Sequence, residues 1–263
     1  ALAREKYANA ASAYEDFLAR YPNDKDIYQW NFYYAECLYY SEQHMPAYEQ
    51  YRVVRELDIR DNKFQEKAAF NAIKSLEFEM QAMAQRGELP AKAVPGSGVE
   101  EARKAAQQQE STQASAEEMA ERDGQVREIK AEQIPAMVDR YVTAMDRYVV
   151  LGLQNESDQQ LDVKLAFQAA KLFYDFKNYD TARERFNWIV DSYPENELAY
   201  LAGSLILETY RQEQDYQQLA IAADKLSKVI KGEQAQAIKE EVRQFKLGAM
   251  FKSAEQLFSA KEY

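Results

Sequence analysis

Apolar residues recur three and four positions apart along most of this chain, the spacing that places them on one face of an α-helix. The pattern is clearest within 163–194, at Phe167, Ala170, Tyr174, Ala182 and Phe186. Gly and Pro, which form turns and end helices, number only 8 and 6 among the 263 residues. A turn-rich β fold would need more of both. The pattern therefore predicts an all-α protein.

The helical pattern is also repeated along the chain. An earlier copy matches those five residues without a gap, at Phe32, Ala35, Tyr39, Ala47 and Tyr51. A second gapless match, at a constant offset of 172 residues, places 6–22 over 178–194 and pairs two Tyr-Pro steps. A chance excess of Ala and aromatic residues in helices would not give a fixed register. We therefore interpret the chain as an array of helical repeats.

The repeat resembles the tetratricopeptide repeat, a 34-residue helix-turn-helix unit with small residues near positions 8 and 20, large ones near 11 and 24, and Pro near 32. In the copy at 163–194 these positions hold Ala170, Ala182, Phe173, Phe186 and Pro194. Small residues let the two helices of a repeat approach closely, and bulky ones fill the space between neighbouring repeats. The resemblance implies a right-handed superhelix, or α-solenoid, of helix-turn-helix repeats.

The register divides the chain into an N-terminal array (1–85), a polar insertion (86–134) and a C-terminal array (135–263). The insertion is inferred because the second helix of one repeat, marked by Tyr141, Ala144 and Tyr148, comes about 50 residues late. Within the arrays we expect helices or repeats at about 3–21, 28–59, 62–85, 163–194, 197–231 and 235–260. Both ends cut through a repeat, so we expect a piece of a longer array.

The insertion has a composition that cannot build a core. It contains Gly96-Ser97-Gly98, followed by a tract rich in Ala, Glu, Gln and Lys. Such a tract can form a helix from propensity alone but lacks an apolar face. We expect a solvated helical arm or a flexible excursion, with a docking arm for a partner as the alternative.

Composition and charge remove several classes of function. The net charge of −11 argues against nucleic acid, whose phosphates require a basic face. One Cys and one His exclude disulfides, Cys-rich zinc sites and two-His metal motifs, so neither a metal nor a cofactor is expected. Adjacent glutamates such as Glu240-Glu241 point apart on a helix and cannot act as a catalytic pair. The longest apolar stretch, about 200–207, is too short for a membrane span. An enzyme is not expected.

Surface shape remains as the basis of function. In the tetratricopeptide family the concave groove is lined by fixed positions of the first helix of each repeat, and the resemblance carries this role to specific residues. The predicted partner-binding residues are Phe32, Tyr39, Tyr40, Phe70, Lys74, Lys164, Phe167, Lys171, Tyr174, Leu201 and Leu205. They give an aromatic and aliphatic groove with a few Lys. The open alternative is that these rings pack against neighbouring repeats or against the insertion.

A further resemblance concerns the subclass. Helices that end in Arg20-Tyr21-Pro22 and Ser192-Tyr193-Pro194 look like those of bacterial cell-envelope tetratricopeptide proteins. These include the outer-membrane assembly lipoprotein type, the Tol–Pal coordinator type and the gliding-motility complex type. The resemblance implies a protein–protein scaffold in the periplasm or cell envelope that binds a partner peptide or helix. The alternative is a cytoplasmic adaptor or secretion-type chaperone that holds amphipathic client segments.

Overall fold

The structure is a computed structural model that describes residues 2–57, 62–94 and 128–232, with single residues between 236 and 251. These parts of the chain contain nine α-helices, one short 3-10 helix and no strand, which confirms the predicted all-α fold. Two compact units divide the chain: Ala1–Gly96 with Pro135–Asp162, and Ser97–Ile134 with Val163–Tyr263. One unit boundary therefore falls near residue 162, whereas the division proposed from sequence follows the insertion.

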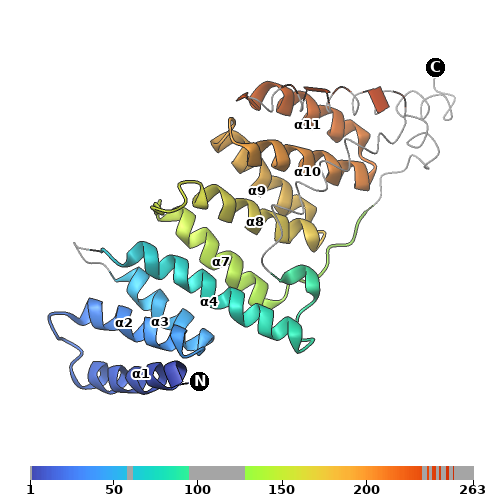
Figure 1. Ribbon diagram of the computed structural model, residues 1–263. Helices are drawn as coiled ribbons and strands as arrows, with labels where there is room; N and C mark the ends of the chain where they lie inside the picture. The colour runs from blue at the N-terminus through green and yellow to red at the C-terminus, as the bar shows by residue number, and fades with distance from the viewer. Residues whose placement is uncertain are drawn as a thin grey trace. The chain divides into compact units, whose positions relative to one another are not determined.

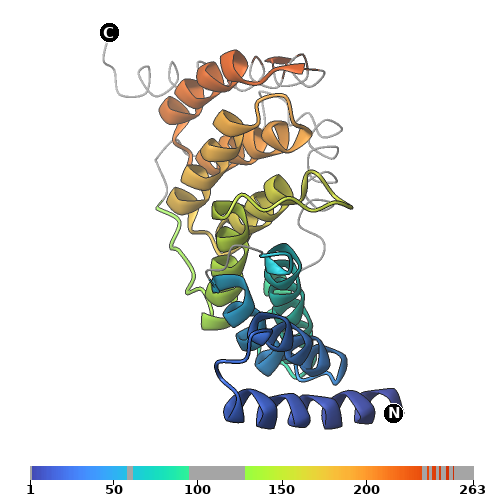
Figure 2. The ribbon, with the colours of Figure 1, turned by 90° about the vertical axis from the view of Figure 1, so that its left-hand side faces the viewer.

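In the first unit, helices pack on one another in chain order (Figures 1 and 2). They are α1 (Leu2–Arg20), α2 (Ile27–Tyr40), α3 (His44–Glu56), α4 (Gln65–Gln85), the 3-10 helix η1 (Ala91–Ala93) and α7 (Ala136–Val150). α7 packs against α4 although 86–135 separate them in sequence. The Tyr141 hydroxyl donates to Glu77 and the Tyr148 hydroxyl to Glu66, both at 2.8 Å. The start of α7 thus lies beside the end of α4, and the two helices run antiparallel.

The second unit contains α8 (Leu161–Asp175), α9 (Tyr179–Ser192), α10 (Glu197–Glu213) and α11 (Tyr216–Val229). Phe167 of α8 and Phe186 of α9 meet in its core with ring centroids 5.6 Å apart. Every residue of α10 from 198 to 209 is buried. This segment is apolar on nearly all sides, and a helix of that kind is stable only when it is surrounded.

The turn after the first helix of a pair has the same backbone geometry in three places. Glu42, Lys177 and Gln214 have positive φ, between 58° and 63°. At each turn the next residue donates its backbone N–H five residues back, which caps the helix: Gln43 to Leu38, Asn178 to Phe173, and Asp215 to Tyr210. Glu42 and Lys177 are 135 residues apart, as are Phe32 and Phe167. Turn geometry and apolar pattern therefore share one register.

Both ends of the proposed insertion make ordered contacts. At its start Leu89 and Ala93 are buried, with exposed fractions of 6% and 0%. At its end, the Glu132 N–H donates to the carbonyl oxygen of Phe176 at 2.9 Å, and Asn178 donates to the Glu132 carbonyl at 3.0 Å. The insertion predicted for 86–134 is thus joined to helical packing at both ends. Its middle, 95–127, lies outside the described residues, as does most of the helix predicted at 235–260.

The turn geometry predicts the effect of replacing Glu42. Glu42→Gly should stabilise the first unit by roughly 1 kcal/mol, because a Cβ disfavours positive φ. The variant loses an exposed ion pair with Arg4, which contributes little. Glu42→Ala is the matched control, since it loses the same pair but keeps the Cβ. Urea unfolding should rank Gly above Ala, and the reverse order would contradict the left-handed conformation at this turn.

Candidate functional site

Five of the predicted partner-binding residues are buried. Their exposed fractions are 3% for Phe32, 0% for Phe167, 8% for Lys171, 3% for Leu201 and 7% for Leu205. Phe32 lies flat against Phe64, with ring centroids 4.2 Å apart and planes at 2°. These side chains therefore contribute to the core, which is the packing alternative raised by the sequence. Contact between them and a partner stays a prediction.

The remaining predicted residues lie nearer the surface. Tyr40 is 50% exposed, whereas the others are half-buried: Tyr39, Phe70, Lys74, Lys164 and Tyr174. Burial, and next the nearby Glu208 carboxylate, raise the pKa of the Tyr174 phenol. Lys74 pairs with Glu77 on its own helix. Among the predicted aromatic residues, Tyr40 at the end of α2 is thus the most exposed, and its ring centroid lies 5.4 Å from that of Tyr39.

Three rings that the groove prediction did not include extend this pair into a larger surface. We call the set Tyr7, Tyr39, Tyr40, His44 and Phe78 the aromatic edge. Tyr7 lies 5.1 Å from Tyr40 between ring centroids, and Tyr39 lies 5.9 Å from Phe78. The His44 ring stacks on Phe78 at 5.1 Å. Four helices of the first unit contribute to this surface, and Tyr7, Tyr40 and Phe78 are each at least 40% exposed.

The end of α2 is the point to which the aromatic edge is anchored. Arg4 of α1 donates from Nε to the Ser41 carbonyl oxygen at 3.1 Å and pairs with Glu42 at 2.7 Å. Arg4 and Tyr7 are three residues apart and share a helix face, so this contact brings Tyr7 beside Tyr40. After the capped turn at Glu42, α3 begins at His44, with Gln43 as the single residue between them. The position of Tyr7 in the repeat could be read from the sequence. Its contact with Tyr40 could not, because that contact depends on how Arg4 joins α1 to the end of α2.

Burial has the largest effect on the pKa of two titratable rings of the edge, Tyr39 and His44, and nearby charges have smaller effects. Burial, followed by the charges of Tyr40, Glu77 and Glu36, raises the pKa of Tyr39. Burial lowers the pKa of His44, although Glu79 and Glu42 act in the opposite direction. The His44 Nδ1 atom is buried and has no hydrogen-bond partner in the structure. The ring is therefore held by stacking on Phe78 and by packing.

Next to Tyr39, a partly buried polar network joins α2, α3 and α4. The Tyr51 hydroxyl donates to Glu36 Oε1 at 2.6 Å, and Asn71 donates to the same oxygen at 2.8 Å. Lys67 donates to Glu36 Oε2 at 3.3 Å. Burial and the bond to Glu36 raise the pKa of the Tyr51 phenol well above its ordinary value. In the second unit the corresponding positions, 135 residues later, hold Phe186 and Lys171, so the hydroxyl and its carboxylate acceptor are replaced together.

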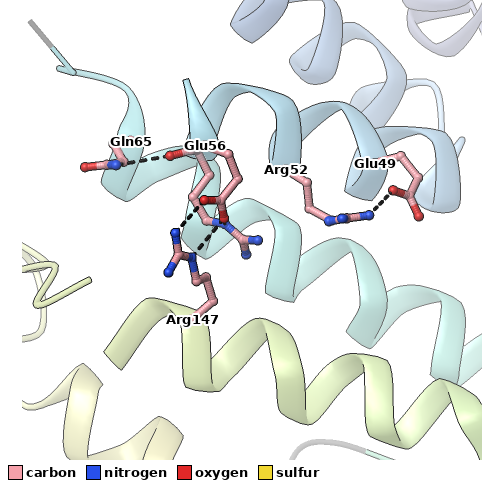
Figure 3. Close-up of polar contacts among 6 residues, drawn as sticks. Glu49, Arg52, Glu56, Gln65 and Arg147 are labelled. Atoms are coloured by element: carbon pink, nitrogen blue, oxygen red, sulfur yellow. Dashed lines mark hydrogen bonds and ion pairs between the residues drawn. The ribbon is translucent and has the colours of Figure 1, made fainter. Parts of the chain in front are cut away.

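A cluster of charged side chains joins the end of α3 to α7. Figure 3 shows Arg147 of α7 reaching Glu56 at the end of α3, with Nε 2.9 Å from Oε1. Arg55, which is 6% exposed, donates from Nε to the same oxygen at 2.8 Å, and its backbone carbonyl accepts from Gln65. The bond to Arg147 is the largest cause that lowers the pKa of Glu56 to about 2. Its contacts tie three helices together, so we assign this cluster to stability.

The second unit holds a comparable polar cluster between α9 and α10. Arg183 donates to Glu213 at 2.6 Å and lies over the Tyr210 ring at 4.5 Å. Glu208, 5% exposed, accepts both guanidinium bonds of Arg211 at 2.6 Å. Each charge in this cluster is matched within the helices, which is what burial of an ionised group requires.

The described residues provide no group of three or more potential metal ligands from His, Cys, Asp and Glu. Within the same parts of the chain, no helix is long and apolar enough to cross a membrane. Comparison with known protein families finds no matching family model, and comparison with curated proteins finds no match.

The pKa of Glu56 predicts a pH dependence of stability. Its carboxyl is depressed from an ordinary 4.5 to about 2, so its contribution is present above about 4.5 and is lost as the pH falls toward 2. Glu56→Gln should cost roughly 1 kcal/mol near neutral pH, limited by solvent screening. The difference from wild type in thermal unfolding should shrink below pH 4.5. A difference that stays constant down to pH 2 would contradict the pairing.

Tyr51 allows a test of the buried network. Tyr51→Phe should destabilise the protein by about 1–3 kcal/mol, because it removes a bond to a carboxylate and leaves Glu36 less satisfied. Tyr40→Phe is the control and should be nearly neutral, since Tyr40 is half exposed. Urea unfolding measures both. Equal effects would mean that the Tyr51 hydroxyl is not part of a stabilising network.

Proposed function

We propose that this chain is a helical-repeat protein of the tetratricopeptide type, and that it acts as a protein–protein interaction scaffold. Support for the repeat comes from the register: capped turns at Glu42 and Lys177 recur at the same spacing as the apolar pattern. The residues expected at close helix contacts, Ala35 and Ala170, are fully buried. Such units place many helix surfaces side by side, which is how repeat proteins build extended binding faces.

The aromatic edge is the observation that carries the interaction function. Exposed aromatic rings offer large contact area at low entropic cost and are enriched where proteins bind one another. Tyr7, Tyr40 and Phe78 come from three helices and are linked through ring contacts with Tyr39 and His44. Because their neighbours hold them in place, a partner that covers them need not order a flexible surface. This favours a preformed docking site for a peptide or helix.

The cellular role is proposed from the resemblance of the repeats. We propose a scaffold within a bacterial envelope complex in the periplasm, of the assembly-lipoprotein, Tol–Pal or motility type. The second candidate is a cytoplasmic adaptor or secretion-type chaperone for amphipathic client segments. The exposed rings support the adaptor and the envelope scaffold equally, because an amphipathic helix of either kind of partner could cover them. Site-specific cross-linking from position 40 in cells, followed by fractionation, distinguishes the two by the compartment in which the cross-linked partner is found.

Substitution of the edge tests the interaction function directly. Tyr40→Ala combined with Phe78→Ala should reduce capture of the native partner at least roughly fivefold, because interface aromatics carry a large share of binding energy. The melting temperature should change only modestly, since both rings are at least 40% exposed.

Trp188→Ala is the matched control, because Trp188 is a 45% exposed ring in the second unit. It should retain capture in the same affinity purification, measured by quantitative mass spectrometry. If the double variant and the control captured the partner equally well, the edge would not be the interaction surface. Circular dichroism of both variants confirms that a loss of capture is not a loss of folding.

A further inference from the structure

At the end of α4, near the aromatic edge, a single cation pairs with two carboxylates. Arg86 pairs with both Glu79, at 3.3 Å, and Glu88, at 2.7 Å. One guanidinium therefore balances two carboxylates at the end of α4. Glu79 is also a carboxylate whose charge reaches His44. The three side chains of Arg86, Glu79 and Glu88 together carry one more negative than positive charge.

The other side of the edge has a matched but exposed pair. Glu42 and Arg4 lie 2.7 Å apart, with side chains that are 59% and 58% exposed. An exposed pair of this kind contributes little to folding and can exchange partners at small cost. Glu42 acts on the pKa of His44 in the same direction as Glu79, and Arg4 acts in the opposite direction. Carboxylates therefore flank the rings on both sides.

Aromatic faces reinforce this preference for positive charge. The face of a Tyr or Phe ring attracts an Arg or Lys side chain, most strongly when the contact excludes water. The chain already uses this contact in its own packing, where Lys67 lies over Phe32 at 5.2 Å and Arg52 over Tyr48 at 5.6 Å. The net charge of −11 adds a long-range attraction for cationic partners and a repulsion of acidic ones.

We infer that the aromatic edge binds a basic amphipathic segment of a partner protein, whose apolar side chains cover Tyr7, Tyr40 and Phe78 and whose Arg or Lys side chains reach Glu42 and Glu79. This inference rests on the proposed interaction function and adds the chemistry of the partner. An acidic amphipathic segment would meet three carboxylates, Glu42, Glu79 and Glu88, against the two guanidinium groups of Arg4 and Arg86. A basic segment without apolar residues would leave the rings exposed to water.

Three synthetic peptides of about 14 residues, or four helical turns, test the inference with the full chain. The first has Leu on one helical face and Arg on the other, the second replaces Arg with Glu, and the third replaces Leu with Ser. Fluorescence anisotropy should show the Arg/Leu peptide binding at least about tenfold more tightly than either of the others. Binding should weaken with rising salt.

Variants of the protein show whether this binding occurs at the edge. Tyr40→Ala and Phe78→Ala should each weaken the Arg/Leu peptide roughly fivefold or more, whereas Tyr40→Phe and Trp188→Ala should not. Glu79→Gln should weaken it and reduce its salt dependence. Rescue by Tyr40→Phe separates the loss of a ring from the loss of a hydroxyl group.

Equal binding of the Arg/Leu and Glu/Leu peptides would overturn the inference, as would Arg/Leu binding that is unchanged by Tyr40→Ala and Phe78→Ala. Equal binding of the Arg/Leu and Arg/Ser peptides would show charge attraction alone and would also overturn it. In each case, loss of the native partner in the Tyr40/Phe78 double variant would still support the interaction function. The two proposals can therefore fail separately.

Discussion

Close approach of successive helices at alanine is the constraint on which the rest of the structure depends. Ala35, Ala47, Ala170 and Ala182 are completely buried, and each occupies a position where a first and a second helix of a pair meet. A larger side chain there would overpack the contact and push the helices apart. The turns that join α2 to α3 and α8 to α9 are each three residues long, and such short connections also keep the paired helices close together. These turns accept a positive φ at a residue other than Gly, at Glu42 and Lys177.

The aromatic edge follows from the same constraint. Large side chains cannot occupy the alanine positions between paired helices, so they lie at other positions, some buried like Tyr51 and Phe186 and some exposed like Tyr40. Tyr39 and Tyr40 are the last two residues of α2, just before the turn, and Tyr40 is half exposed. The Arg4 contact then fixes α1 against this turn and adds Tyr7. An exposed aromatic surface is thus produced by packing rules that otherwise serve the core.

Local pattern was sufficient to predict the helices but not the exposure of individual side chains. The apolar spacing gave an all-α chain and located helices near those observed, because helical periodicity is a property of neighbouring residues. Burial of Phe32 depends on Phe64, which stacks on it from beyond the next helix. The extension of the site to Phe78 depends on α4 lying beside α2 and α3, a relation that no local pattern contains. Likewise, Leu89 and Ala93 are too few to signal a core in sequence, although both are buried.

The two units share one repeat register but place different side chains at equivalent positions. Tyr51 and Glu36 form a bonded pair in the first unit, and Phe186 and Lys171 replace both in the second. A phenol hydroxyl buried without an acceptor would cost free energy, as would a carboxylate buried without a donor. The two positions must therefore change together, and in the second unit Lys171 pairs instead with Asp175 on its own helix.

Tyr141 and Tyr148 follow the same rule, because each hydroxyl donates to a glutamate of α4. Three buried tyrosines of the first unit, Tyr51, Tyr141 and Tyr148, are thus each paired with a glutamate of a neighbouring helix.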